Sequence, residues 1–167
     1  FIAACVQIAI TPNDIKANIE KSVSWLEKAV KENEAELIVF PETVTTGFVT
    51  NLETNELWDL LDDAPGHITA EIQKAAKAHG VHVVWPTYRR GPQRGIIYNS
   101  SILIGPDGGI IGTYDKTHPF PMERADCGGW VTVGNRADVY ETALGSIGMI
   151  ICYDGDFPEL SRILAVK

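Results

Sequence analysis

Short apolar runs alternate with segments of helical periodicity along the first half of the sequence, and this alternation favours a layered α/β fold. Residues 1–10 and residues 36–40 are apolar runs that predict two buried strands. Because parallel strands need a long crossover between them, a β-α-β unit is the economical arrangement of this region. Asn13 or Asp14 can cap the helix between the strands. The apolar positions of this helix follow helical spacing: Ile15, Ile19, Val23, Leu26 and Val30.

The same pattern repeats once and then changes. Residues 67–80 predict a small amphipathic helix closed by Gly80, and residues 81–85 predict the strand that follows it. Residues 98–116 hold two apolar segments around a Pro-Asp-Gly-Gly turn, which predicts a β-hairpin and therefore a mixed sheet. Residues 117–135 show no periodicity, and loops of that length in compact domains are often functional.

Size, charge and cysteine content restrict the partners that we expect. The chain has 167 residues, 45% of them hydrophobic, which is enough to bury the core of one domain. A formal net charge of -8 opposes tight binding to nucleic acid or to an acidic membrane, so we expect a small-molecule or protein partner. No apolar run approaches the roughly 20 residues of a membrane span. Three cysteines without a CxxC pair argue against a disulfide scaffold, and we expect a soluble cytoplasmic protein.

Cys152 stands where a predicted strand meets a predicted helix. Residues 146–151 form the apolar run before it, and Pro158 is a residue favoured in the first turn of a helix. Such a corner places a side chain near helix N–H groups, where the helix dipole and any nearby cation favour a thiolate. A free cysteine is also commonly buried as a packing residue, so the corner alone leaves both interpretations open.

Two other strand ends carry charged side chains. The run "LIVFPE" leads into Glu42, and the run "IIGTYDK" leads into Lys116. Strand ends on one side of an open α/β sheet form the usual crevice for ligands, although either charge alone is more often a solvated residue. A carboxylate, an ammonium group and a thiol are what acyl transfer to sulfur requires, namely a base, a cation for the oxyanion and a nucleophile.

These three motifs together resemble the carbon-nitrogen hydrolase family, also called the nitrilase superfamily. The motifs are "FPE" with Glu42, "YDKTHPF" with Lys116 and "ICYDGDFPE" with Cys152, and their order matches that of the family. The resemblance extends from the first strand to Lys167 and includes the hairpin "YNSSILIGPDG". It implies an α-β-β-α sandwich, commonly dimerised, without a metal or organic cofactor, and a Glu-Lys-Cys triad formed by these three residues.

The resemblance also assigns roles to residues near the triad. The family often uses a second glutamate between the lysine and cysteine motifs, which here is Glu123; the alternative is a loop ion pair between Glu123 and Arg124. In the mechanism that we expect, a thiolate attacks a carboxamide carbon, and Lys116 with the backbone N–H of Tyr153 stabilises the oxyanion. Water, positioned by Glu123, then hydrolyses the thioester.

The residues after the cysteine indicate a class of substrate. Members that resemble true nitrilases usually place Trp and Glu there, whereas this sequence has Tyr153 and Asp154, which resembles the amidase and carbamoylase branches. We therefore expect a small carboxamide or N-carbamoyl substrate. The alternatives are a nitrilase, a non-catalytic α/β interaction module and an isochorismatase-type cysteine hydrolase. The last type uses an aspartate near the first strand, and here the candidate, Asp14, lies beyond that strand. No HxH, HExxH or Cys/His cluster predicts a metal site.

Family members are substantially longer and continue with further strands and helices after the cysteine helix. We therefore expect residues 1–167 to be the N-terminal portion of a single carbon-nitrogen hydrolase domain. This portion contains the triad but lacks strands of the second sheet, so apolar surface and unpaired sheet edges would be exposed. For the complete protein the resemblance implies a homo-oligomer.

Overall fold

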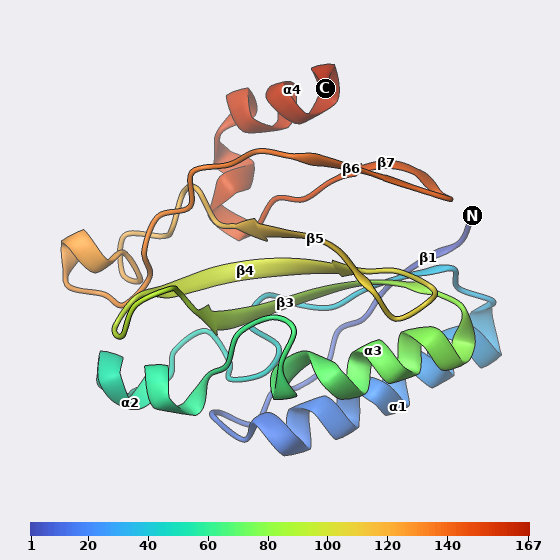
Figure 1. Ribbon diagram of the computed structural model, residues 1–167, viewed down its shortest axis with the longest axis horizontal. Helices are drawn as coiled ribbons and strands as arrows, with labels where there is room; N and C mark the ends of the chain where they lie inside the picture. Colours follow the sequence, from blue (N-terminus) through green and yellow to red (C-terminus); the bar gives the residue numbers. More distant parts are fainter.

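The computed structural model describes residues 1–167 as a stack of layers (Figure 1). Helices α1 and α3 cover one face of a five-stranded sheet, and a two-stranded ribbon and α4 lie on the other face. The layer order is therefore α-β-β-α, as predicted. The elements in chain order are β1 (Ala3–Cys5), α1 (Ile15–Asn33), β2 (Leu37–Val39), α2 (Thr54–Leu60), α3 (His67–His79), β3 (His82–Arg90), β4 (Ile97–Ile104), β5 (Ile110–Asp115), the 3-10 turn η1 (Ala125–Cys127), β6 (Val139–Thr142), β7 (Gly145–Gly148), the 3-10 turn η2 (Cys152–Asp156) and α4 (Pro158–Val166).

The five-stranded sheet is mixed and has the order β1-β2-β3-β4-β5. Strands β1, β2 and β3 pair in parallel, which confirms the predicted β-α-β unit. Strands β3, β4 and β5 pair antiparallel, and the last two form the predicted hairpin. Consequently β2, β3 and β5 all end at the edge of the sheet where β4 begins. Side chains from four strands can meet at this edge.

Helix α1 begins and helix α3 ends where the local sequence predicts. The Asp14 side chain accepts a hydrogen bond from the Ala17 N–H at 3.0 Å and caps α1. Helix α3 ends at Gly80, whose φ of 65° is the left-handed conformation that favours glycine at a helix C-cap. No helix of the protein combines the length and the apolar character that a membrane span requires.

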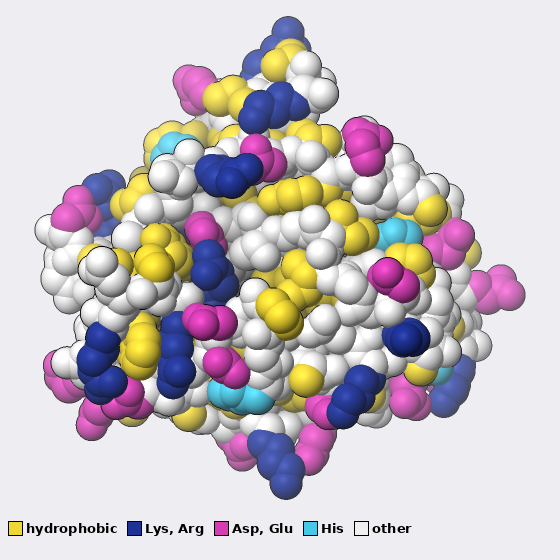
Figure 2. All heavy atoms as spheres, viewed as in Figure 1, with side chains coloured by type: hydrophobic (Ala, Val, Ile, Leu, Met, Phe, Trp, Pro, Cys, Tyr) yellow, Lys and Arg dark blue, Asp and Glu magenta, His cyan; other side chains and the backbone are white.

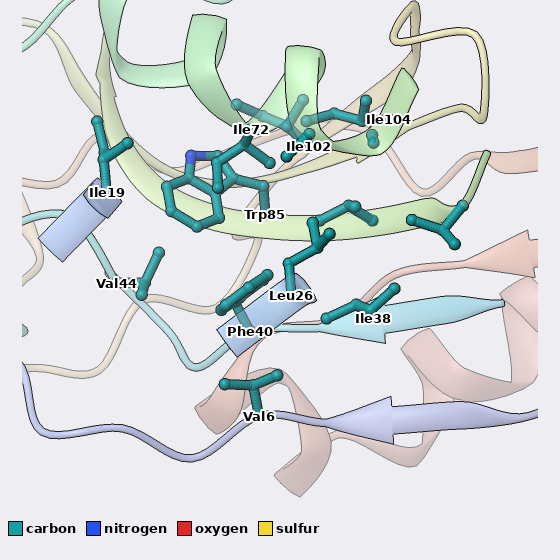
Figure 3. Packing of buried hydrophobic residues seen from close by; sticks show 14 of the residues in the cluster. Val6, Ile19, Leu26, Ile38, Phe40, Val44, Ile72, Trp85, Ile102 and Ile104 are labelled. Carbon is teal, nitrogen blue, oxygen red and sulfur yellow. The ribbon is translucent and has the colours of Figure 1, made fainter. Parts of the chain in front are cut away.

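The main core lies between the sheet and the two helices that cover it (Figure 3). Trp85 of β3 is fully buried, meets Phe40 edge-on at 5.2 Å between ring centroids, and donates its indole N–H to the Ile68 carbonyl at 3.0 Å. Ile19 and Leu26 of α1 pack against it, as the helical spacing predicts. A smaller core on the opposite face joins the sheet to the ribbon and α4.

Two predicted buried strands are more exposed than the sequence suggests. In β1, Ala3 and Cys5 are exposed because β1 is an edge strand with one neighbour. In the run before Cys152, strand β7 ends at Gly148, and its only partner is β6. Ile150 is 41% exposed, so the prediction of a continuous buried strand is wrong there. The ribbon packs only one of its faces on the first sheet, which leaves alternate side chains exposed.

Candidate active site

The charged residues selected from the sequence meet at the sheet edge described above. Lys116 directly follows β5, and Glu42 lies just beyond β2. The Lys116 Nζ atom is 2.7 Å from Glu42 Oε1 and 2.6 Å from Glu123 Oε1. The side chains of Lys116 and Glu123 are fully buried, whereas that of Glu42 is 20% exposed. One ammonium group therefore bridges two carboxylates, one of which opens to solvent.

Lys116 is a fixed positive charge. Burial works to lower the pKa of its ammonium group, but hydrogen bonds and charges from Glu123 and Glu42 outweigh burial and raise the pKa. The ammonium also lies 5.8 Å from the centre of the Phe48 ring, where the face of the ring attracts a cation. A buried, permanently charged lysine is suited to stabilising a developing oxyanion.

Glu123 uses both carboxylate oxygens to accept hydrogen bonds from the protein. Its Oε1 accepts from Lys116 and from the Phe120 N–H at 2.9 Å. Its Oε2 accepts from Asn99 Nδ2 at 3.1 Å and, at a longer 3.4 Å, from the Tyr88 hydroxyl. Burial and the Glu123 charge raise the pKa of Tyr88, so its hydroxyl keeps the proton that it donates. Glu123 is thus an anchoring group inside the site.

The alternative ion pair between Glu123 and Arg124 does not form. The Arg124 guanidinium instead binds Asp126, with Nε 2.8 Å from Oδ1, on the exposed surface of the loop. The cation paired with Glu123 is Lys116, seven residues earlier in the chain. The two neighbouring loop residues therefore face opposite environments.

Glu42 is held at one oxygen only. Its Oε1 accepts hydrogen bonds from Lys116 at 2.7 Å and from Asn99 Nδ2 at 2.8 Å. Glu42 and Cys152 also line the same cavity of about 200 Å³ between the first sheet and residues 150–152. Glu42 can therefore exchange a proton with a group in this cavity while its other oxygen stays anchored.

Cys152 occupies a sharp corner of the backbone. Its φ is 48°, a left-handed conformation that residues with a Cβ atom adopt at a cost. The turn η2 starts at this residue, and α4 starts with Pro158 at its first position, as predicted. The side chain is exposed, so the thiol is accessible from solvent.

The N–H groups of the corner and Lys116 act to lower the pKa of the Cys152 thiol, as the sequence predicts, but burial and Glu42 outweigh them and raise it. Partial burial raises the pKa of the Cys152 thiol, and the charge of the nearby Glu42 raises the pKa further. The charge of Lys116 and the Tyr153 N–H lower the pKa by less. The nearest carboxylate acts against thiolate formation at rest. A protonated thiol beside a carboxylate is the usual pairing of a nucleophile with its base.

Asp154 fixes this corner to the loop that follows Lys116. Its buried carboxylate accepts hydrogen bonds from the Tyr114 hydroxyl at 2.8 Å, Thr117 Oγ1 at 3.2 Å, and the N–H groups of His118 and Ile151, each at 2.9 Å. Our sequence-based prediction used Asp154 only as a marker of substrate class. The signal in the sequence for this contact was an acidic residue two positions after the cysteine.

Asn99 was also missed. It lies on β4 with no exposed surface and donates to both glutamates. Asparagine is depleted in strands, so its presence in the apolar hairpin was the sequence signal for a role in the site.

His118 does not belong to a metal site. It stacks on Phe157, with ring centroids 4.0 Å apart. No group of three or more His, Cys, Asp or Glu side chains is arranged to hold a metal ion.

Fold and site together define an α-β-β-α protein in which a cysteine lies beside a carboxylate and a buried ammonium group. The model of the carbon-nitrogen hydrolase family matches residues 2–167. The chain belongs to the carbon-nitrogen hydrolase family, as the sequence motifs predict.

Two relatives from different organisms share this similarity. A probable nitrilase of Schizosaccharomyces pombe is 33% identical over 166 residues, which cover 98% of this chain and 59% of the relative. A formamidase of Bacillus cereus strain Q1 is 33% identical over 174 residues, which cover 100% of this chain and 50% of the relative. The chain thus spans between half and three fifths of the length of these relatives.

Solved structures agree with this result. A branch 10 member of the nitrilase superfamily from Saccharomyces cerevisiae superimposes with a TM-score of 0.83 at 25% identity, covering 98% of this chain and 59% of that chain. A carbon-nitrogen hydrolase from Helicobacter pylori G27 has a TM-score of 0.83 at 26% identity, covering 99% of this chain and 56% of that chain. The shared fold therefore extends over nearly all of residues 1–167.

Proposed function

We propose that the protein hydrolyses the carbon–nitrogen bond of a small carboxamide or N-carbamoyl compound through a thioester on Cys152. The observation that carries this proposal is the geometry of Lys116, which lies within 2.7 Å of both Glu42 and Glu123 beside that cysteine. Membership of the carbon-nitrogen hydrolase family supports the reaction class. The similarity to a formamidase supports a small amide as substrate.

In the first half of the reaction Glu42 takes the proton of the Cys152 thiol, and the sulfur attacks the carbonyl carbon of the substrate. The carbonyl oxygen becomes an oxyanion, which Lys116 and the Tyr153 N–H stabilise. The tetrahedral intermediate then collapses. Glu42 returns its proton to the departing nitrogen, so ammonia or an amine leaves and the acyl group stays on sulfur.

In the second half a water molecule attacks the thioester while Glu42 takes one of its protons. The new oxyanion occupies the same position, and its collapse breaks the carbon–sulfur bond, returns the proton to sulfur and releases a carboxylic acid. Glu123 already accepts hydrogen bonds on both oxygens. Its role in this mechanism is therefore to hold Lys116 rather than to position the water.

We further propose that residues 1–167 form the N-terminal portion of a single carbon-nitrogen hydrolase domain. The share of the relatives that the chain covers and the two-stranded second sheet support this assignment. For the complete protein the family resemblance supports a cytoplasmic homo-oligomer that acts on a small molecule.

Ammonia release from a panel of carboxamides, N-carbamoyl compounds and matching nitriles tests the proposal, using the protein at its full natural length. We expect Cys152→Ala to abolish release with the fold intact, whereas Cys127→Ala, which changes another exposed cysteine, leaves it unchanged. Substantial release by Cys152→Ala would overturn the mechanism. We expect amides to react faster than nitriles, because a nitrile must pass through a thioimidate that needs further water and protons. The reverse preference would overturn the substrate class.

A further inference from the structure

Asn99 contacts Glu42, Glu123 and Lys116 at the sheet edge. Its Nδ2 donates to Glu42 Oε1 at 2.8 Å and to Glu123 Oε2 at 3.1 Å. Its backbone carbonyl accepts a hydrogen bond from the N–H of Lys116 at 2.8 Å. The residue is fully buried near the start of β4, opposite Tyr88 of β3. One neutral side chain therefore links both carboxylates.

The orientation of this amide follows from charge. Each of the two Nδ2 hydrogens has a carboxylate acceptor, and a flipped amide would turn its oxygen towards two negative charges. No protein donor contacts Oδ1, so no competing interaction favours the flipped state. Leaving a buried acceptor without a protein donor destabilises a fold. The contribution of the amide at this position is therefore its two donated hydrogen bonds, because its oxygen has no protein donor.

Lys116 alone does not fix the direction of the Glu42 carboxylate. An ammonium group is a compact charge with rotatable donors, so it can bind either carboxylate oxygen. The Asn99 amide is planar, and its second hydrogen bond to Glu123 prevents it from following a rotation of Glu42. Asn99 therefore supplies the directional contact that Lys116 lacks.

We propose that Asn99 is a positioning residue, which holds Glu42 by Oε1 so that the other oxygen stays turned towards Cys152. This inference rests on the proposed function, in which Glu42 is the base for the thiol. The charged and titratable groups around that carboxylate are Lys116, Glu123, Tyr88 and Cys152. Asn99 donates to Glu42 itself and to Glu123.

The first test follows the Cys152 thiol without turnover. The charge of Glu42 raises the pKa of Cys152, so displacing Glu42 from the thiol should lower that pKa. In Asn99→Leu, which keeps the side-chain size but removes the donor, we expect the pH midpoint of Cys152 alkylation by iodoacetamide to fall by about half a unit or more. Mass spectrometry of the Cys152 peptide separates this signal from the other cysteines. Glu42→Gln removes the charge completely and therefore gives the largest fall of the alkylation midpoint that displacement of Glu42 can cause.

Thr87→Val is the matched control. It removes a buried hydrogen bond on the neighbouring strand, between the hydroxyl groups of Thr87 and Thr45 at 2.6 Å, without touching either carboxylate. We expect it to lower stability as Asn99→Leu does and to leave the alkylation midpoint of Cys152 unchanged. The control separates positioning from a general loss of packing.

The second test divides kcat from KM for the best amide in the panel. We expect kcat of Asn99→Leu to fall by about 10- to 100-fold with KM changed by about twofold or less, because the base is misaligned while the pocket is intact. Asn99→Ser, which resembles the next two residues of β4, is the second variant in case the first does not fold. A midpoint equal to the wild type in a folded Asn99 variant would overturn the inference, as would the failure of both variants to fold.

The two proposals fail in different ways. If the wild-type protein releases ammonia from none of the amides, the proposed function fails, whereas the alkylation midpoint still decides the role of Asn99. If the wild type is active and the Asn99 variants alkylate and turn over normally, only the positioning role fails.

Discussion

The left-handed backbone of Cys152 determines where its sulfur lies. The chain reaches this residue from the buried Ile151, and the positive φ at Cys152 starts η2 instead of continuing the extended run. The Cys152 side chain is exposed although Ile151 before it is buried and Tyr153 after it is half-buried. Strained backbone conformations of this kind cluster at functional sites.

Substitution by glycine measures this strain. A residue with a Cβ atom in the left-handed region costs about 1–2 kcal/mol, and the greater flexibility of glycine in the unfolded chain offsets about 0.5–1 kcal/mol. We therefore expect Cys152→Gly to be more stable than Cys152→Ala by about 0.5–1 kcal/mol in urea unfolding. At Cys127, which does not have a positive φ, the order should reverse. Greater stability of the alanine variant at position 152 contradicts the backbone assignment.

The neighbours of the thiol should shift its reactivity in opposite directions. Glu42 raises the pKa of Cys152, and Lys116 lowers it. Glu42→Gln should therefore lower the alkylation midpoint while reducing turnover by about 100-fold or more, and Lys116→Met should raise the midpoint. Iodoacetamide labelling across pH measures both effects. Equal midpoints in the two variants would show that neither charge reaches the sulfur.

The sequence motifs predicted Glu42, Lys116 and Cys152, and Glu123 followed as the glutamate between the lysine and cysteine motifs. Asn99 has no such motif. Its hydrogen bond to Glu42 spans 57 positions of the chain, so its contribution depends on strand pairing that local patterns do not specify. Contacts between distant segments account for most of what sequence reasoning missed at the site.

At the scale of elements, helical periodicity predicted α1 and α3 and apolar runs predicted β1 and β2, whereas α2 and β6 were missed. Helix α1 has 19 residues and α3 has 13, enough for several turns of a repeating apolar pattern. Helix α2 has 7 residues and β6 has 4, too few for a pattern to be distinct from its surroundings. The predicted strand over residues 146–151 extends beyond β7, which ends at Gly148, because the apolar run continues after the pairing with β6 stops.

The contact between the cysteine corner and the loop after β5 should depend on Asp154. Replacing its carboxylate by an amide in Asp154→Asn turns a donor towards a set of N–H and O–H donors, including His118 and Ile151. We expect a loss of about 2–3 kcal/mol in the free energy of unfolding, measured with urea. Asp156→Asn, exposed in the same turn, should change stability by less than about 0.5 kcal/mol. Wild-type stability of Asp154→Asn would show that this network is dispensable.

At the scale of the whole molecule, the distribution of apolar surface is uneven. Charged side chains of both signs are interspersed on the face shown in Figure 2, so the net charge of -8 is not gathered into one acidic patch there. Large apolar side chains are exposed at β1, β5, the run before Cys152 and α4: Phe1, Ile2, Ile111, Ile150, Ile163 and Val166. Exposed apolar side chains at a sheet edge or on an uncovered helix favour contact with another chain or aggregation.

Residues 1–167 expressed alone should therefore self-associate and lack activity. The second sheet has two strands, and α4 exposes Ile163 at 44% and Val166 at 68%, so apolar surface is available for contact between chains. We expect this chain to elute as large species in size-exclusion chromatography and to melt without cooperativity. The chain extended to the length of its relatives should elute as one species and release ammonia. Exchanging Ile163 and Val166 for glutamate should reduce self-association without restoring activity, because added charge prevents contact but completes no sheet. A monomeric, cooperatively melting and active protein of residues 1–167 would contradict this prediction.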